Sequence, residues 1–400
     1  MSRLLLFFIP IKIFADVIFS NIPISKIEII NLEIESCKER CLNNLSKDGK
    51  IMSFIARFDK NIDDEELQNL MREYANEIGI YYKIPFESMG DKIEVALLMP
   101  KKIIGKYSTS TIDTVLSYLL FRNINFRFKI FDNVDESREI FEENIEKIKD
   151  ENFNFLIAIV SNKDNVALLE ELKMPIYIPT MMGNSARSNI VFGGIDYQAQ
   201  IKTLSDVKED NANTIIYNDD SSLGRFLGDV TKSINENVKI EDSIDNKIAA
   251  NFYQNIQRAQ NYIEGANIYL NTPVVKSGLL LSQINLSNIK PGKILSTQVN
   301  YNPALLSLIK GIDFENIIIA NSINVDMDKK LIEYGRLLNS DITYDWVNYS
   351  TALGIDFFTS KMNKKLERYF KEEIDNNQVV YGINLYLSLI HISEPTRPHD

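Results

Sequence analysis

Small polar residues follow two apolar segments of this sequence, at the points where each segment ends. Ser161 and Asn162 come directly after the apolar run Phe155–Val160, and Thr180 comes directly after Met174–Pro179. Because the carboxyl ends of neighbouring parallel strands meet at one edge of a sheet, where open sheets place their ligands, we expect Ser161 and Thr180 to lie at a binding edge. Hydroxyl and amide side chains there can hydrogen-bond a ligand, or they can simply cap the helix that follows.

Histidine chemistry is not expected in the natural chain. The two histidines, His391 and His399, lie in a tail in which LSLIHISEPTR, Leu387–Arg397, resembles a translated sequencing adapter. We therefore interpret residues 387–400 as an artefact and expect the natural reading frame to end near Tyr386. Without these two residues, a histidine-based triad, a histidine metal site and imidazole general-base catalysis are not expected.

Other signatures of catalysis are missing from the sequence as well. It contains neither the nucleophile motif GxSxG nor the phosphate-binding motif GxxxxGK[ST]. The acidic pairs Asp63/Asp64 and Asp219/Asp220 stand at expected helix starts, where helix capping accounts for them. We therefore expect a protein that is not an enzyme and that uses no cofactor and no metal ion.

Two cysteines, Cys37 and Cys41, share one turn of an expected helix. In an oxidising compartment such a pair suggests a disulfide, although residues i and i+4 of a regular helix bridge poorly without distortion. A zinc site is less favoured because no third or fourth ligand accompanies the pair. A local disulfide and a zinc site therefore both stay open, and the disulfide is favoured over the zinc site.

A strand, a helix and a second strand must position Ser161 and Thr180. The continuous apolar run Phe155–Val160 suits a strand that is buried on both faces of a parallel sheet. The apolar stripe from Val166 to Leu172 predicts a helix, and Met174–Pro179 returns as the second strand. A crossover this short between two apolar strands indicates an α/β fold.

The alternation of strands and helices continues along the chain from Asp91 and predicts a doubly wound parallel sheet. A second series of the same kind begins near Asn213, so two successive sheets imply two lobes. Before them, residues 16–90 form an extension with an expected strand over Ile27–Ile34 and a helix over Asp63–Ile78. We therefore expect a small α+β N-terminal extension followed by two α/β lobes.

The composition of the chain argues against binding to nucleic acid, and its N-terminus indicates secretion. The chain has 400 residues and a formal charge of −11, and it lacks the basic surface that a nucleic-acid binder needs. The apolar run after Arg3 predicts a secretory signal peptide over residues 1–15, with a buried strand or an uncleaved anchor as alternatives. No later segment is apolar enough to span a bilayer, so we expect a soluble periplasmic protein without a transmembrane segment in the mature chain.

Four segments follow one another along the chain: IEVALLMP (93–100), AIVSNKDNVALLEELKMPIYIPT (158–180), TIIYNDDSSLGRFLGDVTKSI (214–234) and ITYDWVNYSTALGIDFF (342–358). In their order and residue types they resemble the type I periplasmic binding-protein family, which includes branched-chain amino-acid receptors, and its relatives that activate penicillin-binding proteins. The resemblance covers about Asp91–Tyr386. The resemblance implies that residues 91–205 plus 321–386 form lobe 1, that residues 206–320 form lobe 2, and that crossing strands join the lobes around a cleft.

The resemblance also implies a pocket. The family's ligand-binding residues correspond to Ser161, Asn162 and Thr180 on lobe 1, and to Asn218, Asp219 and Thr272 on the rim of lobe 2. Helix N-termini with hydroxyl or amide side chains offer donors to a carboxylate, and Asp219 offers an acceptor to an ammonium group. Capping of the following helices is the alternative explanation for these residues.

Two features depart from the family pattern. The extension before Asp91 is unusual for a receptor. The loop Met181–Asn189 follows the place of a second ligand-contacting serine or threonine and has Ser185, Arg187 and Ser188 available. Arg187 can hold an anion, but a solvated loop residue is the favoured interpretation. Two functions therefore remain: a module that binds a small polar solute such as an amino acid between its lobes, or a ligand-free adaptor or activator of cell-wall synthesis that contacts a cell-envelope protein.

Overall fold

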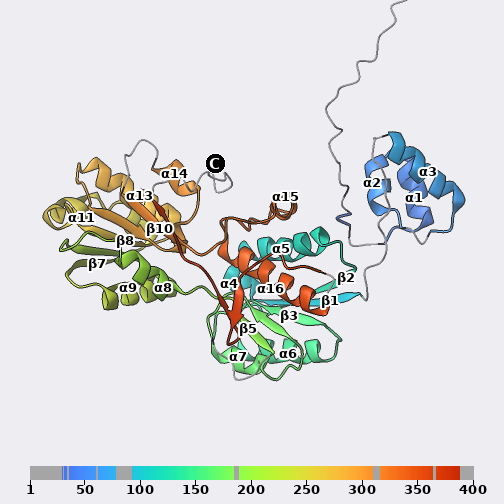
Figure 1. Ribbon diagram of the computed structural model, residues 1–400, viewed down its shortest axis with the longest axis horizontal. Coiled ribbons are helices and arrows are strands. Elements are labelled where there is room, and N and C mark those ends of the chain that lie inside the picture. The colour runs from blue at the N-terminus through green and yellow to red at the C-terminus, as the bar shows by residue number, and fades with distance from the viewer. Residues whose placement is uncertain are drawn as a thin grey trace, which may run out of the picture. The chain divides into compact units, whose positions relative to one another are not determined.

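The computed structural model describes residues 29, 31–33, 36–59, 62–77, 92–183, 189–309, 316–363 and 366–387. The chain divides into two compact units, 1–87 and 88–400 (Figure 1). The predicted signal peptide, the loop residues Ser185, Arg187 and Ser188, and both histidines lie outside the described residues. No described helix combines the length and the apolar character needed to cross a membrane.

The first unit contains three helices in its described part. They are α1 (Glu39–Lys47), α2 (Ile51–Arg57) and α3 (Glu65–Glu77). Their apolar faces enclose a small core that includes Leu42 and Phe54, neither of which is exposed. Of the expected strand over residues 27–34, residues 27, 28, 30 and 34 lie outside the described ranges, and the described residues 29 and 31–33 are not in a strand.

Cys37 and Cys41 form a disulfide in this unit, with 5.3 Å between their Cα atoms. Cys37 precedes the first residue of α1, Glu39, whereas Cys41 lies within the helix. Because only one of the two residues has helical geometry, the i and i+4 spacing does not prevent the bridge. The disulfide therefore links the residues just before α1 to the first turn of that helix.

The second unit contains two sheets, of which the first has the strand order β11-β12-β5-β4-β3-β1-β2. Its neighbouring strands are parallel, except that β11 pairs antiparallel with β12 at one edge. The strands are β1 (Ile93–Met99), β2 (Phe126–Asp132), β3 (Phe155–Ala158), β4 (Ile176–Ile178), β5 (Ile190–Phe192), β11 (Glu373–Asp375) and β12 (Gln378–Val380).

Helices cover both faces of this sheet (Figure 1). Side chains alternate along β1, so that Val95 and Leu97 join one apolar cluster and Ala96 and Leu98 join another. One face carries α5 and α16, and the other carries α6 and α7. The helices of this lobe are α4 (Lys101–Ile104), α5 (Tyr107–Phe121), α6 (Arg138–Lys149), α7 (Asp164–Leu169), α15 (Lys329–Leu337) and α16 (Trp346–Met362).

The second sheet has the order β13-β10-β9-β8-β6-β7, with β13 antiparallel at its edge. Its strands are β6 (Thr214–Asp219), β7 (Val238–Ile244), β8 (Asn267–Asn271), β9 (Lys293–Ser296), β10 (Ile317–Asn321) and β13 (Asn384–Leu387). Its helices are α8 (Tyr197–Ser205), α9 (Ser222–Ile234), α10 (Asn246–Ala250), α11 (Tyr253–Arg258), α12 (Gln260–Ile263), α13 (Val274–Leu286), the 3₁₀ turn η1 (Gln298–Asn300) and α14 (Ala304–Leu308). The predicted α/β class with two doubly wound, mainly parallel sheets is confirmed.

Two elements lie in a different lobe from the one that the expected boundaries assign. Ile201 and Leu204 of α8 pack against the second sheet, although residues up to 205 were expected in lobe 1. Strand β13 pairs with β10 of the second sheet, although residues 321–386 were expected in lobe 1. The chain therefore crosses between the lobes before α8, after β10 and before β13.

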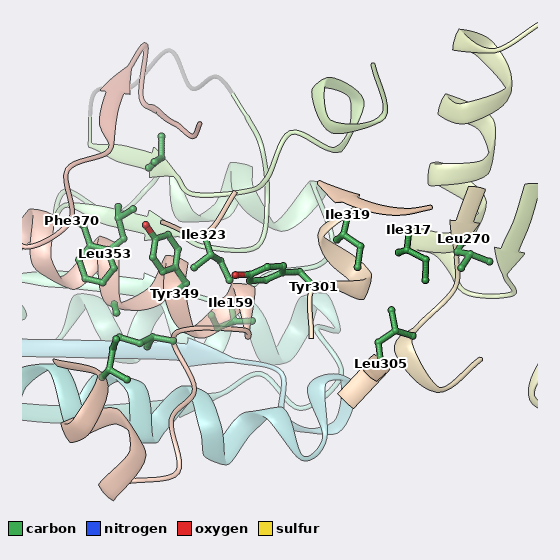
Figure 2. Packing of buried hydrophobic residues seen from close by; sticks show 14 of the residues in the cluster. Ile159, Leu270, Tyr301, Leu305, Ile317, Ile319, Ile323, Tyr349, Leu353 and Phe370 are labelled. Carbon is green, nitrogen blue, oxygen red and sulfur yellow. The ribbon is translucent and has the colours of Figure 1, made fainter. Parts of the chain in front are cut away.

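An apolar core connects the two lobes. Tyr301, which follows η1, is 1% exposed and belongs to the same cluster as Ile159 of the first lobe. Its ring lies 5.5 Å from that of Tyr344 and 5.0 Å from that of Tyr386, measured between centroids. Figure 2 shows Tyr301 between first-lobe residues such as Tyr349 and second-lobe residues such as Ile319. The two lobes therefore share buried apolar surface.

Candidate functional site

The first-lobe residues that were predicted to bind a ligand contact a carboxylate of the chain itself. The backbone N–H of Ser161 donates to Glu136 Oε1 at 2.8 Å, and its hydroxyl donates to Oε2 at 2.6 Å. The backbone N–H of Asn162 donates to Oε2 at 3.0 Å. Glu136 is 6% exposed, so its carboxylate lies buried against three converging donors. Two N–H groups and one hydroxyl that converge in this way suit a carboxylate ligand, and the Glu136 carboxylate already accepts from all three.

The local backbone aims Glu136 at these donors. Glu136 lies in the turn between β2 and α6 with φ of +58°, a left-handed conformation that is uncommon for residues other than glycine. Its N–H donates to the carbonyl of Asn133 at 2.9 Å, and its own carbonyl accepts from Asn165 Nδ2 at 3.3 Å. Asn165 belongs to α7, so the Glu136 turn is held by the element that follows Ser161.

Thr180 has a local role in the structure. Its hydroxyl donates to the carbonyl of Val160 at 2.7 Å. This hydrogen bond joins the segment that follows β4 to the segment that follows β3. Because Val160 directly precedes Ser161, this bond also helps to position the Ser161 N–H. Thr180 therefore lies beside the Ser161 group, as expected, but its hydroxyl is already engaged.

The second-lobe residues lie at the end of β6, close to α9. A Cβ atom on Gly228 would lie 2.1 Å from Asn218 Nδ2, so only glycine permits the approach of α9 to this strand end. Asn218 accepts from Asn271 Nδ2 at 3.0 Å and donates to Glu241 Oε1 at 3.3 Å. The amide of Asn218 is therefore used on both sides within the lobe.

Asp219 pairs with an ammonium group of the chain itself. Lys276, on α13, donates to Asp219 Oδ1, to Asp220 Oδ1 at 2.7 Å and to the carbonyl of Ile244 at 2.8 Å. Lys276 is 8% exposed and Asp219 is 7% exposed. A lysine ammonium has three N–H donors, and these three bonds use all of them. The acceptor that was predicted for a ligand ammonium is therefore occupied.

The pKa values of Asp219 and Lys276 shift in the directions that keep both side chains charged. Burial alone would raise the pKa of Asp219, but hydrogen bonds from Lys276 and Ser221 outweigh burial and lower it. Burial alone would lower the pKa of Lys276, but hydrogen bonds to Asp219 and Asp220 outweigh burial and raise it. Both groups therefore stay ionised near neutral pH.

Thr272 completes the second-lobe group and is fully buried. Its hydroxyl shares a hydrogen bond of 2.7 Å with the hydroxyl of Ser277, and its carbonyl accepts from Asn300 Nδ2 at 3.0 Å. Within the part of the chain that the structure describes, no hydrogen bond links the second-lobe group to the Ser161 group. The structure therefore forms two separate polar groups, one in each lobe.

Glu136 and Lys276 were not among the predicted site residues. Both carry signals that are visible in the sequence. Glu136 lies in the turn after β2, four residues beyond the last residue of that strand, Asp132, and Lys276 is the only charged residue of the helix segment VVKSGLLLSQINL. Neither signal identifies the partner, because the contacts span 25 and 57 residues of sequence.

A surface hollow of about 660 Å³ lies elsewhere in the second unit. It is lined by Arg122, by residues 326–328 and by residues of the segment 366–371, and by none of the six predicted site residues. Among the described residues, no group of three or more histidine, cysteine, aspartate or glutamate side chains is placed to hold a metal ion.

The sequence matches no known family model, and no curated protein matches it either. The structure does resemble solved proteins. A leucine-binding protein, LivK of Thermotoga maritima, is 12% identical with a TM-score of 0.52, and the match covers 74% of this chain and 95% of that one. LivJ of Streptococcus pneumoniae, a branched-chain amino-acid transporter substrate-binding protein in complex with isoleucine, is 10% identical with a TM-score of 0.56 over the same shares. This chain has the type I periplasmic binding-protein fold.

A third similar structure belongs to the same group of binding proteins. It is an amino-acid ABC transporter substrate-binding protein of Pseudomonas fluorescens, 11% identical with a TM-score of 0.52, and the match covers 74% of this chain and 90% of that one. These proteins are named for binding. Within the type I periplasmic binding-protein fold, this chain places Glu136 and Lys276 on the polar groups at its strand ends.

Proposed function

We propose that this protein is a cell-envelope adaptor that acts through protein–protein contacts and holds no free solute between its lobes. The observation that carries the proposal is the burial of the Glu136 carboxylate against the N–H groups of Ser161 and Asn162 and the Ser161 hydroxyl. A free amino acid would have to displace this tethered carboxylate, which is present at a very high effective concentration.

The second lobe supports the same proposal independently. A free amino acid would also have to bring its ammonium group to Asp219, where Lys276 already donates. Displacing Lys276 would leave a buried ammonium without its acceptors, which costs several kcal/mol, about 3–5 for a buried pair. The carboxylate and the ammonium of an amino-acid ligand therefore both meet an internal competitor.

A periplasmic location fits this function. The Cys37–Cys41 disulfide supports it, because disulfides form and persist in oxidising compartments and are rare in the cytosol. The proposed partner is a protein of the cell envelope, and the proposed role needs no catalysis.

The alternative function is reception of a small polar solute such as an amino acid. The likeness of the fold to leucine- and isoleucine-binding proteins favours it. This function requires Glu136 and Lys276 to leave the positions in which the structure holds them.

A thermal-shift panel of the twenty amino acids distinguishes the two functions. We expect no change in the melting temperature of the full chain. A receptor at a hundred times its dissociation constant would gain about 2.7 kcal/mol, which gives a clear rise in melting temperature. A rise that the Ser161→Ala variant abolishes would contradict the adaptor and establish the receptor.

A further inference from the structure

Helix α1 begins without a side-chain cap. Its N-cap residue, Lys38, makes no side-chain hydrogen bond to the first turn of the helix. The helix has nine residues, and helices of this length are marginal on their own in water. The disulfide joins Cys37, which precedes Lys38, to Cys41 in the first turn. A covalent bond therefore holds the turn that no side-chain cap holds.

Both cysteines also belong to the core of the first unit. Cys37 is buried, and Cys41 packs against the same apolar cluster. Leu42, the residue after Cys41, is fully buried in this cluster together with Phe54 of α2 and Leu67 of α3. Figure 1 shows the three helices packed together. Unwinding the first turn of α1 would therefore pull Leu42 out of the core that all three helices share.

The described core of this unit is small and contains residues of the first unit alone. Small cores bury little apolar surface, so they commonly depend on disulfides for their stability. The second unit has its own apolar clusters, and residues 88–400 contain no cysteine. The buried members of the first unit's cluster are Cys37, Leu42, Phe54, Ile55, Ile62, Leu67 and Met71.

We propose that the Cys37–Cys41 disulfide is a redox switch of the first unit. A dithiol reductant opens the disulfide and the three-helix core with it, while the second unit stays folded. Because the second unit contains no cysteine, reduction acts on the first unit alone. This inference goes beyond the proposed adaptor function, since it concerns the folded state of the first unit and needs neither a ligand nor a partner protein.

The burial of the two residues sets the order of the exchange. Cys41 is partly exposed and Cys37 is buried, so a thiolate of the reductant attacks the Cys41 sulfur and forms a mixed disulfide. The Cys37 sulfur leaves as a thiolate beside the N-terminus of α1, where the helix dipole stabilises negative charge. The second thiol of the reductant then attacks the mixed disulfide and releases Cys41. Two electrons pass to the protein, the two thiol protons of the reductant end on Cys37 and Cys41, and the reductant leaves as a cyclic disulfide.

Hydrogen exchange on the full chain, read by mass spectrometry, tests this proposal. We expect dithiothreitol to accelerate exchange in peptides from α1, α2 and α3 by about tenfold or more. Peptides from β1 and β6 of the second unit should keep their exchange rates, and reoxidation should restore slow exchange in the first unit. A disulfide that resists dithiothreitol, an unchanged rate in the reduced first unit, or equal acceleration in the second unit overturns the proposal.

The double variant Cys37→Ser/Cys41→Ser separates the disulfide from other effects of the reductant. It should show the fast exchange of the reduced first unit without any reductant, and dithiothreitol should change nothing further. Slow exchange in this variant overturns the proposal, because the core would then be stable without the bond. None of these results depends on whether the protein binds an amino acid, so failure here is distinct from failure of the proposed function.

Peptide mapping tests the order of the exchange. Brief treatment of the full chain with glutathione, stopped with acid, should place the glutathione adduct on Cys41. An adduct on Cys37 would contradict the order in which the partly exposed residue is attacked first.

Discussion

Glu136 and Lys276 bring their charges to the polar residues at the strand ends, and at this residue scale they occupy groups that were predicted to bind a ligand. Glu136 accepts from Ser161 and Asn162, and Lys276 donates to Asp219. Each lobe therefore satisfies its own polar group. An internal partner of this kind lowers the apparent affinity for any outside ligand of the same charge, because the ligand must first displace it.

Replacing Glu136 tests its hydrogen bonds and its backbone separately. We expect Glu136→Ala to lower the free energy of unfolding by about 1–3 kcal/mol, because three donors lose their acceptor. Glu136→Gly loses the same bonds but relieves the left-handed φ of +58°, which costs a non-glycine residue about 1–2 kcal/mol. Urea unfolding therefore ranks glycine above alanine at this position. Equal stability of both variants with the wild type would show that the Glu136 contacts do not form.

Replacing Lys276 leaves a buried carboxylate without its partner. We expect Lys276→Met to destabilise the protein by about 3–5 kcal/mol, the usual cost of breaking a buried ion pair. The double variant Lys276→Met/Asp219→Asn removes the orphaned charge and should recover part of the loss. A double variant that loses the full sum of the two single effects would contradict a direct coupling between these residues.

The pair also predicts how stability depends on pH. The pKa of Asp219 is lowered from 3.8, so its contribution is present above that value and is lost as the pH falls below it. The pKa of Lys276 is raised from 10.5, so its contribution is present below that value and is lost as the pH rises above it. In Lys276→Met, Asp219 keeps its burial but loses the Lys276 hydrogen bonds, so its pKa rises and protonation relieves the orphaned charge as the pH falls. The difference in unfolding free energy between the wild type and Lys276→Met should therefore be largest at mildly alkaline pH and shrink both as the pH falls and as it rises above 10.5. A difference that does not shrink toward acid pH would contradict this assignment.

At the scale of elements, α16 organises the first lobe and its crossings. Asp356, in the middle of α16 and fully buried, accepts from the hydroxyl of Tyr118 and from the N–H groups of Tyr369 at 3.0 Å and Phe370 at 3.2 Å. It thereby joins α5 and the segment before β11 to one helix. Ser350, near the start of α16, donates to the carbonyl of Gly193 at 2.9 Å in the first crossing segment.

Replacing Asp356 should therefore destabilise the protein more than removing any single one of its hydrogen bonds. We expect Asp356→Ala to cost about 3 kcal/mol or more, because a buried hydroxyl and two N–H groups lose their acceptor, whereas Tyr118→Phe removes one bond and costs about 1 kcal/mol. Hydrogen exchange at the amides of Tyr369 and Phe370 should accelerate in Asp356→Ala and stay slow in Tyr118→Phe. The assignment fails if exchange at these amides is the same in both variants.

The elements themselves were largely predictable, and their long-range partners were not. Apolar runs such as Phe155–Val160 indicate buried strands, so the two α/β sheets follow from local patterns. The lobe to which α8 and β13 belong depends on packing across the crossings, which no local pattern encodes. The same reason explains the site: the Ser161 turn was predictable, but the Glu136 carboxylate arrives from another turn through tertiary contacts.

At the scale of the whole second unit, the shared core around Tyr301 should make the two lobes unfold together. Trp346 is the single tryptophan, and it lies in the first lobe, so its fluorescence reports that lobe while circular dichroism reports helices throughout the chain. We expect the fluorescence transition to coincide with the main dichroism transition in the wild type. Tyr301→Ala should cost about 3–5 kcal/mol and separate the two transitions, because it removes a buried aromatic ring between the lobes. Transitions that are already separate in the wild type would contradict a shared core.

The central claim is that the chain fills its own carboxylate site, and the amide signals of Ser161 and Asn162 test it most directly. Acetate titrated into the wild type should leave both signals in place, because the Glu136 carboxylate occupies their donors. In Glu136→Ala acetate should move both signals with saturation, whereas in Glu139→Ala, which removes an exposed carboxylate three residues away, it should leave them in place. Saturable movement of these two signals in the wild type would contradict the account.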